Sequence, residues 1–123
     1  MTPRLTAILP CNDLDASESF YNRLGLFQDE ANRNEHQDYR PLSDGGGGDI
    51  HLTKAVGGRV VKGRNPFGLY LYTEDVDAFA ARFLGEIIEK DGASHKPWGI
   101  YEFALSDPDD TLVRIGWPSR RMK

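Results

Sequence analysis

The feature that most constrains the fold of this chain is an internal repeat. The run Asp13–Ala16, which reads Asp-Leu-Asp-Ala, recurs as Asp75–Ala78, which reads Asp-Val-Asp-Ala. A short strand-like run precedes each copy, and a helical run that ends in Leu-Gly follows it. The two copies stand roughly half the chain apart, so two copies of one structural unit account for nearly all of the 123 residues.

Each copy is predicted to begin an amphipathic helix. Asp13 and Asp75 are predicted N-caps, because a carboxylate can accept the unpaired backbone N–H groups of the first helical turn. Gly25 and Gly85 stand where a left-handed C-terminal cap is typical. The apolar residues of each helix recur at helical spacing and share one face: Ala16, Phe20, Tyr21 and Leu24 in the first copy, and Val76, Phe79, Ala80 and Phe83 in the second.

Short apolar runs between turn residues predict β-strands around these helices. The predicted strands are Leu5–Leu9, Leu26–Glu30, Tyr39–Ser43 and Ile50–Lys54, and then Leu69–Thr73, Glu86–Lys90, Tyr101–Ser106 and Thr111–Trp117. This order predicts an α+β fold of two tandem βαβββ modules in one domain over 1–123. The modules cover about 1–56 and 67–123, with a linker at 57–66. Each module leaves one sheet face uncovered, so we expect the two modules to form a cleft.

The composition excludes several classes of protein. Hydrophobic residues make up 39% and charged residues 28% of the chain, values typical of globular proteins rather than disordered ones. The net charge of −4 argues against nucleic acid or an anionic membrane as the main partner, and weakly favours a cationic ligand. Cys11 is the single cysteine and no stretch approaches a membrane span, so we expect a cytoplasmic protein.

Some residues of chemical interest have a plain structural interpretation. Gly45–Gly48 lacks the Gly-Lys-Ser/Thr ending of a phosphate-binding loop and is predicted to be a hairpin turn. His36, His51 and His95 lie in separate segments without the spacing of a metal site. Cys11 has no nearby histidine in the sequence, which favours a small buried side chain over a nucleophile.

Three runs of residues resemble one protein superfamily. The run Leu9–Ser17, with the Phe-Tyr and Leu-Gly that follow it, resembles the first-helix signature of the glyoxalase/bleomycin-resistance/dioxygenase (vicinal oxygen chelate) superfamily. The runs Pro97–Phe103 and Asp107–Leu112 resemble its bleomycin-resistance branch. Asp110 stands where that branch usually carries glycine, and Asp tolerates a positive φ comparatively well. The resemblance spans nearly the whole chain and implies paired βαβββ modules around a cleft.

The superfamily's enzymes place one metal ligand on the first and last strand of each module. The resemblance puts these four positions at Thr6, His51, Gly68 and Arg114. Only His51 is a plausible ligand, because Gly68 has no side chain, Thr6 is a poor donor and Arg114 carries a permanent positive charge. We therefore expect no metal, no cofactor and no catalytic residue.

Strand alternation predicts which side chains line the cleft. Tyr70 and Tyr72 share one strand face, and Arg114 is predicted to point inward from the last strand. Glu102 is expected near Arg114, either as an ion pair or as an anion offered to a ligand, and Trp98 near the mouth. The predicted ligand-binding residues are His51, Tyr70, Tyr72, Trp98, Glu102 and Arg114. The alternative is that the tyrosines are ordinary sheet residues, Trp98 a loop anchor and the ion pair structural.

The resemblance also implies a function. Proteins of this branch sequester bleomycin-type antibiotics as homodimers, often exchanging the N-terminal strand between subunits. A planar, cationic drug would suit a cleft lined with aromatic rings. The first hypothesis is therefore a metal-independent protein that gives antibiotic resistance by binding. The alternative is a metal-dependent glyoxalase-type lyase/isomerase or dioxygenase of the same superfamily, and a third hypothesis is a binding protein for another small metabolite.

Overall fold

The computed structural model describes residues 3–30, 33 and 38–122. His36 lies outside the described residues. The chain divides into two compact units, Met1–Arg64 and Asn65–Lys123. No helix within the described part of the chain is long and apolar enough to span a bilayer.

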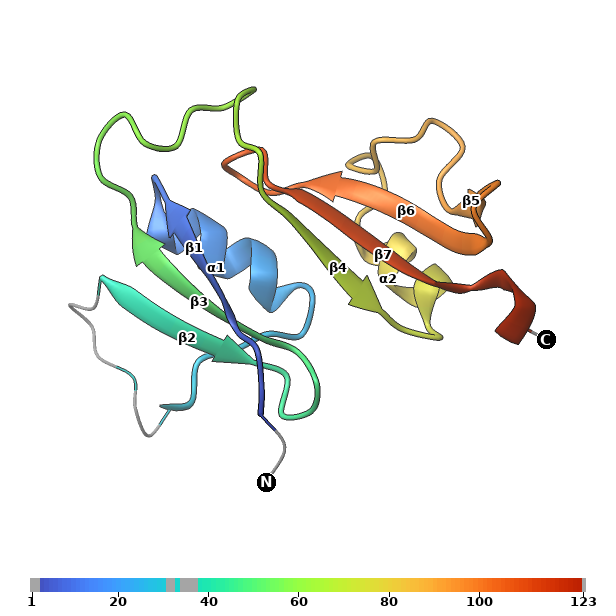
Figure 1. Ribbon diagram of the computed structural model, residues 1–123, viewed down its shortest axis with the longest axis horizontal. Helices are drawn as coiled ribbons and strands as arrows, with labels where there is room; N and C mark the ends of the chain where they lie inside the picture. The colour runs from blue at the N-terminus through green and yellow to red at the C-terminus, as the bar shows by residue number, and fades with distance from the viewer. Residues whose placement is uncertain (1–2, 31–32, 34–37, 123) are drawn as a thin grey trace. The chain divides into compact units, whose positions relative to one another are not determined.

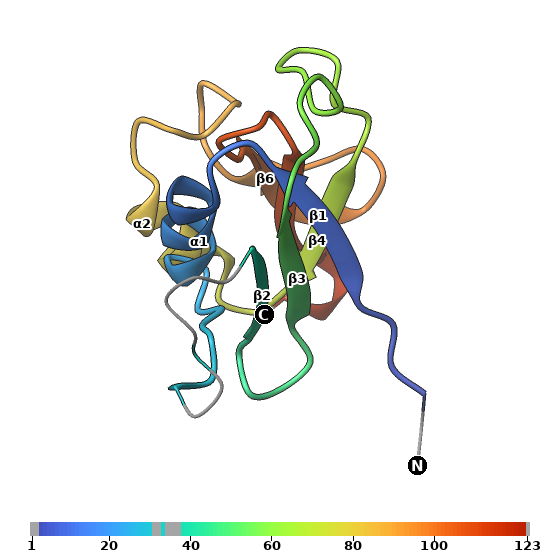
Figure 2. The ribbon, with the colours of Figure 1, turned by 90° about the vertical axis from the view of Figure 1, so that its left-hand side faces the viewer.

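The first unit is a three-stranded sheet with one helix. Its elements are β1 (Ala7–Cys11), α1 (Leu14–Asn22), β2 (Tyr39–Ser43) and β3 (Asp49–Lys54). The strand order is β1-β3-β2, in which β1 runs parallel and β2 antiparallel to β3. Helix α1 contacts β3 and lies against one face of the sheet (Figures 1 and 2). The side chains of Tyr21, Leu42 and Leu52 are completely buried in this unit.

The second unit repeats this plan with one more strand. Its elements are β4 (Gly68–Tyr72), α2 (Val76–Arg82), β5 (Ser94–His95), β6 (Ile100–Ser106), β7 (Leu112–Pro118) and the 3₁₀ helix η2 (Ser119–Arg121). The strand order is β4-β7-β6-β5, with β4 parallel to β7 and the other pairs antiparallel. Helix α2 contacts β6 and β7 (Figure 1). Phe83, Phe103 and Ile115 are fully buried.

The shared topology confirms the tandem repeat. In each unit the first strand pairs in parallel with the last strand, and the strand before the last pairs antiparallel with it. A parallel pair requires a crossover, which here includes the helix that follows the first strand. The structure therefore has two βαβββ-like modules in two mixed sheets, and β1 pairs with β3 of the same chain.

Two predicted strands are absent as strands. In the segment 26–30 only Phe27 forms a β-bridge, to Ser43, and the segment 86–90 belongs to no sheet. In the latter, the Ile88 N–H donates to the Ala104 carbonyl, but the Ala104 N–H donates to the Glu89 carboxylate at 2.9 Å. The Glu89 carboxylate thus accepts the Ala104 N–H that would otherwise donate to a backbone carbonyl of a neighbouring strand, so no strand pairing continues along 86–90. The fourth strand of the second unit is instead the two-residue β5.

Both predicted N-cap residues stand at helix N-termini, and both predicted glycines have a left-handed backbone just after the helices end. The Asp13 carboxylate accepts the Ala16 N–H at 3.1 Å, and Gly25 and Gly85 have φ values of +87° and +85°. Asp75 is the N-cap residue of α2, as predicted, but its side chain does not make the capping hydrogen bond that was expected of it. The Asp75 backbone, at φ −90° and ψ 40°, is not extended like that of Asp13, so the carboxylate does not turn back over the first turn.

The β2–β3 and β6–β7 hairpins each close on an aspartate side chain, one exposed and one buried. The Asp44 carboxylate accepts the N–H groups of Gly46 and Gly48 in the exposed glycine turn between β2 and β3. The Asp107 carboxylate accepts two buried N–H groups, from Asp109 and Thr111, each at 2.8 Å. Asp110 has a positive φ of 62°, as the sequence predicted for this turn. The glycine run is thus a hairpin turn, and Cys11 is buried with 1% exposure.

These two hairpins give a matched test of buried hydrogen bonding. The substitution Asp107→Ala leaves two buried N–H groups without their carboxylate and should lower the free energy of unfolding by about 2–4 kcal/mol. The substitution Asp44→Ala should lower it by less than about 1 kcal/mol, because water can replace the lost acceptor. Urea unfolding of both variants measures the difference. Equal losses would show that burial does not decide the contribution of these turns.

Candidate functional site

Five of the six predicted ligand-binding residues lie together in the second unit. Strand register places Tyr70 of β4 opposite Arg114 of β7, and Glu102 of β6 opposite Gly116 of β7. Tyr72 pairs with the same Gly116 from the other side. Because residues paired across strands point to the same face of a sheet, these side chains share one face. Trp98 reaches the group from the loop before β6.

The buried Glu102 carboxylate is the centre of this cluster. Only 1% of the residue is exposed. Its Oε1 accepts from the Tyr70 hydroxyl at 2.8 Å and from Trp98 Nε1 at 3.4 Å, and its Oε2 accepts from Arg114 Nη1 at 2.7 Å. Both oxygens therefore have protein partners. Of the two roles that the sequence left open for Glu102, the structure shows the ion pair.

Gly116, which is not among the predicted ligand-binding residues, makes room for this network. A Cβ at this position would lie 2.7 Å from the Glu102 Cβ and closer still to the Tyr70 hydroxyl. Real side chains do not approach so closely, so any larger residue would displace the carboxylate or the phenol. The sequence signal for its place is the spacing from Arg114, because residues two apart on a strand share one face. The structure pairs Gly116 with both Tyr72 and Glu102.

The network perturbs the ionisation of Tyr70. Burial and then the hydrogen bond to the Glu102 carboxylate raise the pKa of Tyr70 well above the ordinary value for tyrosine. Arg114 opposes this shift, because its positive charge favours the phenolate. The phenol is thus held protonated, as the donor that Glu102 needs.

Two aromatic side chains at the cluster are exposed. Tyr72 is 59% exposed and Trp98 is 60% exposed. The rings of Tyr70 and Tyr72 have centroids 4.4 Å apart and an interplanar angle of 31°. The Arg114 guanidinium lies 5.9 Å from the centre of the Trp98 ring and its side chain is 40% exposed. The surface above the buried carboxylate therefore offers flat aromatic groups and a guanidinium whose charge Glu102 balances.

His51, the sixth predicted residue, lies in the first unit on β3. Its Nδ1 is 2.8 Å from the Tyr39 hydroxyl, and the two rings form an edge-to-face pair. The structure does not bring His51 together with the other five residues within one unit.

The four positions that the superfamily's enzymes use for metal ligands do not form a suitable donor set. The Thr6 hydroxyl is 3.4 Å from the Asp49 carboxylate, which also pairs with Arg4. His51 contacts Tyr39, and Arg114 pairs with Glu102. Gly68 has no side chain to offer, and a guanidinium does not bind a cation. Among the described residues, no three His, Cys, Asp or Glu side chains are grouped as a metal site would require.

The pKa of Tyr70 gives the network a testable pH dependence. A tyrosine whose pKa is raised on folding contributes stability that is complete below the ordinary pKa of about 10 and is lost as the pH rises above it. Tyr70→Phe should lower the free energy of unfolding by about 1 kcal/mol or more at neutral pH. That difference from the wild type should shrink as the pH rises above about 10.

The control is Tyr72→Phe, whose lost hydroxyl has no hydrogen-bond partner within the described part of the chain. It should change stability little and without this pH dependence. Urea unfolding at several pH values measures both variants. A Tyr70→Phe effect that stays constant with pH would contradict the raised pKa.

Comparison with known proteins identifies the fold. No protein-family model and no curated protein matches the chain. Among solved structures, a bleomycin-binding protein complexed with bleomycin is 24% identical, with 94% of this chain and 98% of that chain covered and a TM-score of 0.71. A bleomycin resistance determinant encoded on the transposon Tn5 is 25% identical, with 95% and 98% covered and a TM-score of 0.71.

An enzyme is also similar. Lactoylglutathione lyase from Agrobacterium tumefaciens is 20% identical, with 98% of this chain and 97% of that chain covered and a TM-score of 0.68. Proteins described as antibiotic-binding and a protein described as an enzyme therefore share the architecture seen here. The chain has the glyoxalase/bleomycin-resistance (vicinal oxygen chelate) fold that its sequence resembles.

Proposed function

We propose that this chain is a metal-independent binding protein that sequesters a planar, cationic antibiotic of the bleomycin type. The observation that carries the proposal is the pair of exposed aromatic side chains, Tyr72 and Trp98, above the buried Glu102–Arg114 pair. The similarity to a bleomycin-binding protein solved with bleomycin supports the choice of ligand.

Aromatic stacking would supply most of the affinity for such a ligand. An exposed indole or phenol loses little conformational freedom when a flat ring stacks on it, and aromatic pairs contribute beyond their buried area. Tyr72 already packs against Tyr70, whose hydroxyl is fixed by Glu102. The aromatic surface is therefore ordered before a ligand arrives, which lowers the entropic cost of binding.

The preference for a cation cannot come from Glu102, because its two oxygens are occupied and buried. In our proposal it comes from the ring faces of Tyr72 and Trp98, which attract cations, and from the net charge of −4. Arg114 already lies near one ring face, at 5.9 Å from Trp98. A cationic ligand would compete with Arg114 there or stack on the opposite face.

The proposal assigns no catalytic role to any residue. Of the residues at Thr6, His51, Gly68 and Arg114, only His51 offers a good metal-binding group, and the Arg114 guanidinium has no lone pair with which to coordinate a metal. The alternative function is a metal-dependent glyoxalase-type lyase/isomerase or dioxygenase, and the similarity to lactoylglutathione lyase is the observation that favours it. Stoichiometric metal in the purified protein, together with turnover of an α-keto hemithioacetal, would support that alternative instead.

We further propose a cytoplasmic homodimer in which both units line a cleft and His51 contributes to it. In this chain β1 pairs with its own β3. If the N-terminal strand were exchanged, β1 of one subunit would pair in the same way with β3 of the other subunit. Light scattering after size-exclusion chromatography measures the oligomeric state. A monomer that binds the ligand with unchanged affinity at all protein concentrations would contradict this part of the proposal.

The first test is a titration of chelator-treated protein with metal-free bleomycin. The variant Trp117→Phe leaves Trp98 as the one indole, so its fluorescence reports on the proposed site. We expect saturable quenching at about one ligand per chain, with a Kd below about 1 μM. An absence of quenching at about a hundred-fold higher concentration would overturn bleomycin as the ligand, and other planar metabolites would then be tested.

Substitution of Trp98 separates a binding role from a structural one. Trp98→Ala should weaken bleomycin binding at least about tenfold in calorimetry. Its melting temperature should stay within a few degrees of the wild type, because the side chain is 60% exposed. Phe27→Ala, which removes an exposed aromatic ring from the first unit, is the control and should leave binding unchanged. A large loss of stability in Trp98→Ala would instead make Trp98 a structural anchor.

A further inference from the structure

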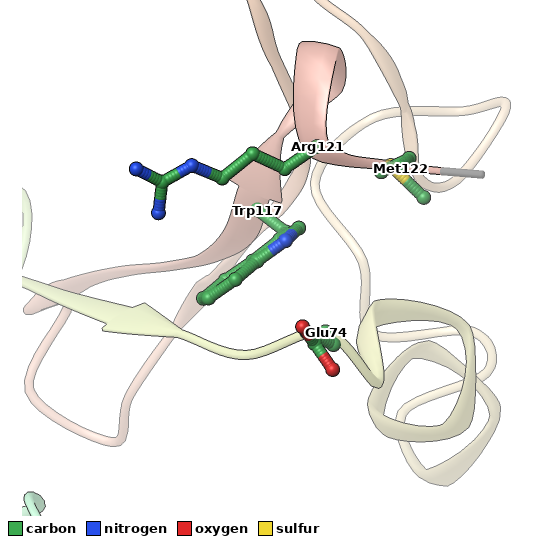
Figure 3. Close-up of a pocket in the computed structure, with 4 residues that line it drawn as sticks. All are labelled: Glu74, Trp117, Arg121 and Met122. Atoms are coloured by element: carbon green, nitrogen blue, oxygen red, sulfur yellow. The ribbon is translucent and has the colours of Figure 1, made fainter.

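A pocket of about 390 Å³ lies in the second unit, separate from the residues of the proposed antibiotic site. Its lining comes from the loop that enters α2, the end of β7 and the C-terminal segment (Figure 3). The lining residues are Glu74, Trp117, Arg121 and Met122. None of them is among the predicted ligand-binding residues, and the proposed function gives none of them a role in binding.

The pocket lies on the opposite face of the sheet from Glu102. Trp117 follows Gly116 on β7, and successive strand residues point to opposite faces. Trp117 is paired with Tyr101, whose hydroxyl donates to the Asp77 carboxylate of α2 at 2.5 Å. The Trp117 indole is therefore on the face that α2 covers, whereas the Glu102 network is on the other face.

The pocket combines an aromatic plane with one positive and one negative group. Figure 3 shows Arg121 and Glu74 on opposite sides of the Trp117 indole. Within the described residues, neither charged group has an ion-pair partner, and the two do not pair with each other. Met122 adds a flexible apolar side chain to the lining.

We propose that this pocket binds a small aromatic zwitterion of the free α-amino acid class. The planar guanidinium of Arg121 matches a carboxylate, and the Glu74 carboxylate accepts hydrogen bonds from an ammonium group. The Trp117 indole provides a stacking surface for the ligand's ring. A ligand with both charges satisfies both groups at once, whereas a simple anion or cation leaves one of them unmatched. The volume is near the lower end for small-molecule pockets, which suits a single amino acid.

The chain offers a selective reporter for this pocket, because it has only two tryptophans. The variant Trp98→Phe leaves Trp117 as the one indole. L-Phenylalanine is the probe, since it has no indole emission of its own. We expect a saturable change in Trp117 fluorescence with a Kd at or below about 1 mM. The matching variant Trp117→Phe, in which Trp98 reports, should show no saturable change.

Two fragments of the probe separate the roles of the charged residues. Arg121→Gln should weaken binding of phenylalanine and 3-phenylpropionate about tenfold and leave phenethylamine unaffected. Glu74→Gln should weaken phenylalanine and phenethylamine by a similar factor and leave 3-phenylpropionate unaffected. Arg120→Gln and Asp75→Asn remove the same charges from neighbouring positions outside the pocket lining and should leave every affinity unchanged.

These measurements can overturn the proposal in two ways. No saturable response of Trp117 up to about 10 mM phenylalanine would show that the pocket does not bind this class of ligand. Equal weakening by Arg121→Gln and Arg120→Gln would show that overall charge, and not the pocket, attracts the probe. Because Trp98 and bleomycin are not involved, either result is distinct from failure of the antibiotic-binding proposal.

Discussion

The second unit depends on how it holds one buried charge. A carboxylate with 1% exposure is stable only if it is paired and hydrogen-bonded, and Glu102 receives donors from β4, β7 and the loop before β6. Those donors, Tyr70, Arg114 and Trp98, are thereby fixed relative to each other. Removing Tyr70 or Arg114, which make the two short contacts, would leave the charge incompletely compensated, so the geometry of the aromatic surface and the stability of the sheet are coupled. The space that Gly116 leaves open completes this arrangement.

The first unit also contains a buried glutamate paired with an arginine, but at a different position in the fold. Glu18 of α1 is also buried, at 5% exposure, and pairs with Arg40 of β2 at 2.9 Å. That pair joins the helix to the sheet, whereas the Glu102–Arg114 pair joins two adjacent strands on the face away from the buried apolar residues of β7. The repeat therefore preserves topology while the polar contacts have diverged.

Strand periodicity was sufficient to predict much of the candidate site. Side-chain alternation placed Tyr70, Tyr72 and Arg114 on one face. The prediction holds because β4 and β7 pair continuously, with no bulge to shift the alternation. The predictions that failed did so for different local reasons. Glu89 takes the Ala104 N–H and ends the ladder that would have made 86–90 a strand. The Asp75 carboxylate does not reach its helix because the local backbone turns it away. Which hydrogen bond a side chain makes depends on the three-dimensional arrangement of its neighbours, and the local sequence pattern does not contain that information.

The two faces of the four-stranded sheet have different chemical characters, and the difference follows from β7. Arg114 and Gly116 point to one side, where a balanced ion pair lies under exposed aromatic groups. Val113 and Ile115 are buried on the other side, and Trp117 continues that face to the edge of the apolar core, where it lines a pocket with Glu74 and Arg121. The first face suits a flat ligand held mainly by stacking, because its charges are already satisfied. The second suits a ligand that brings its own pair of charges, because Glu74 and Arg121 have no ion-pair partners among the described residues.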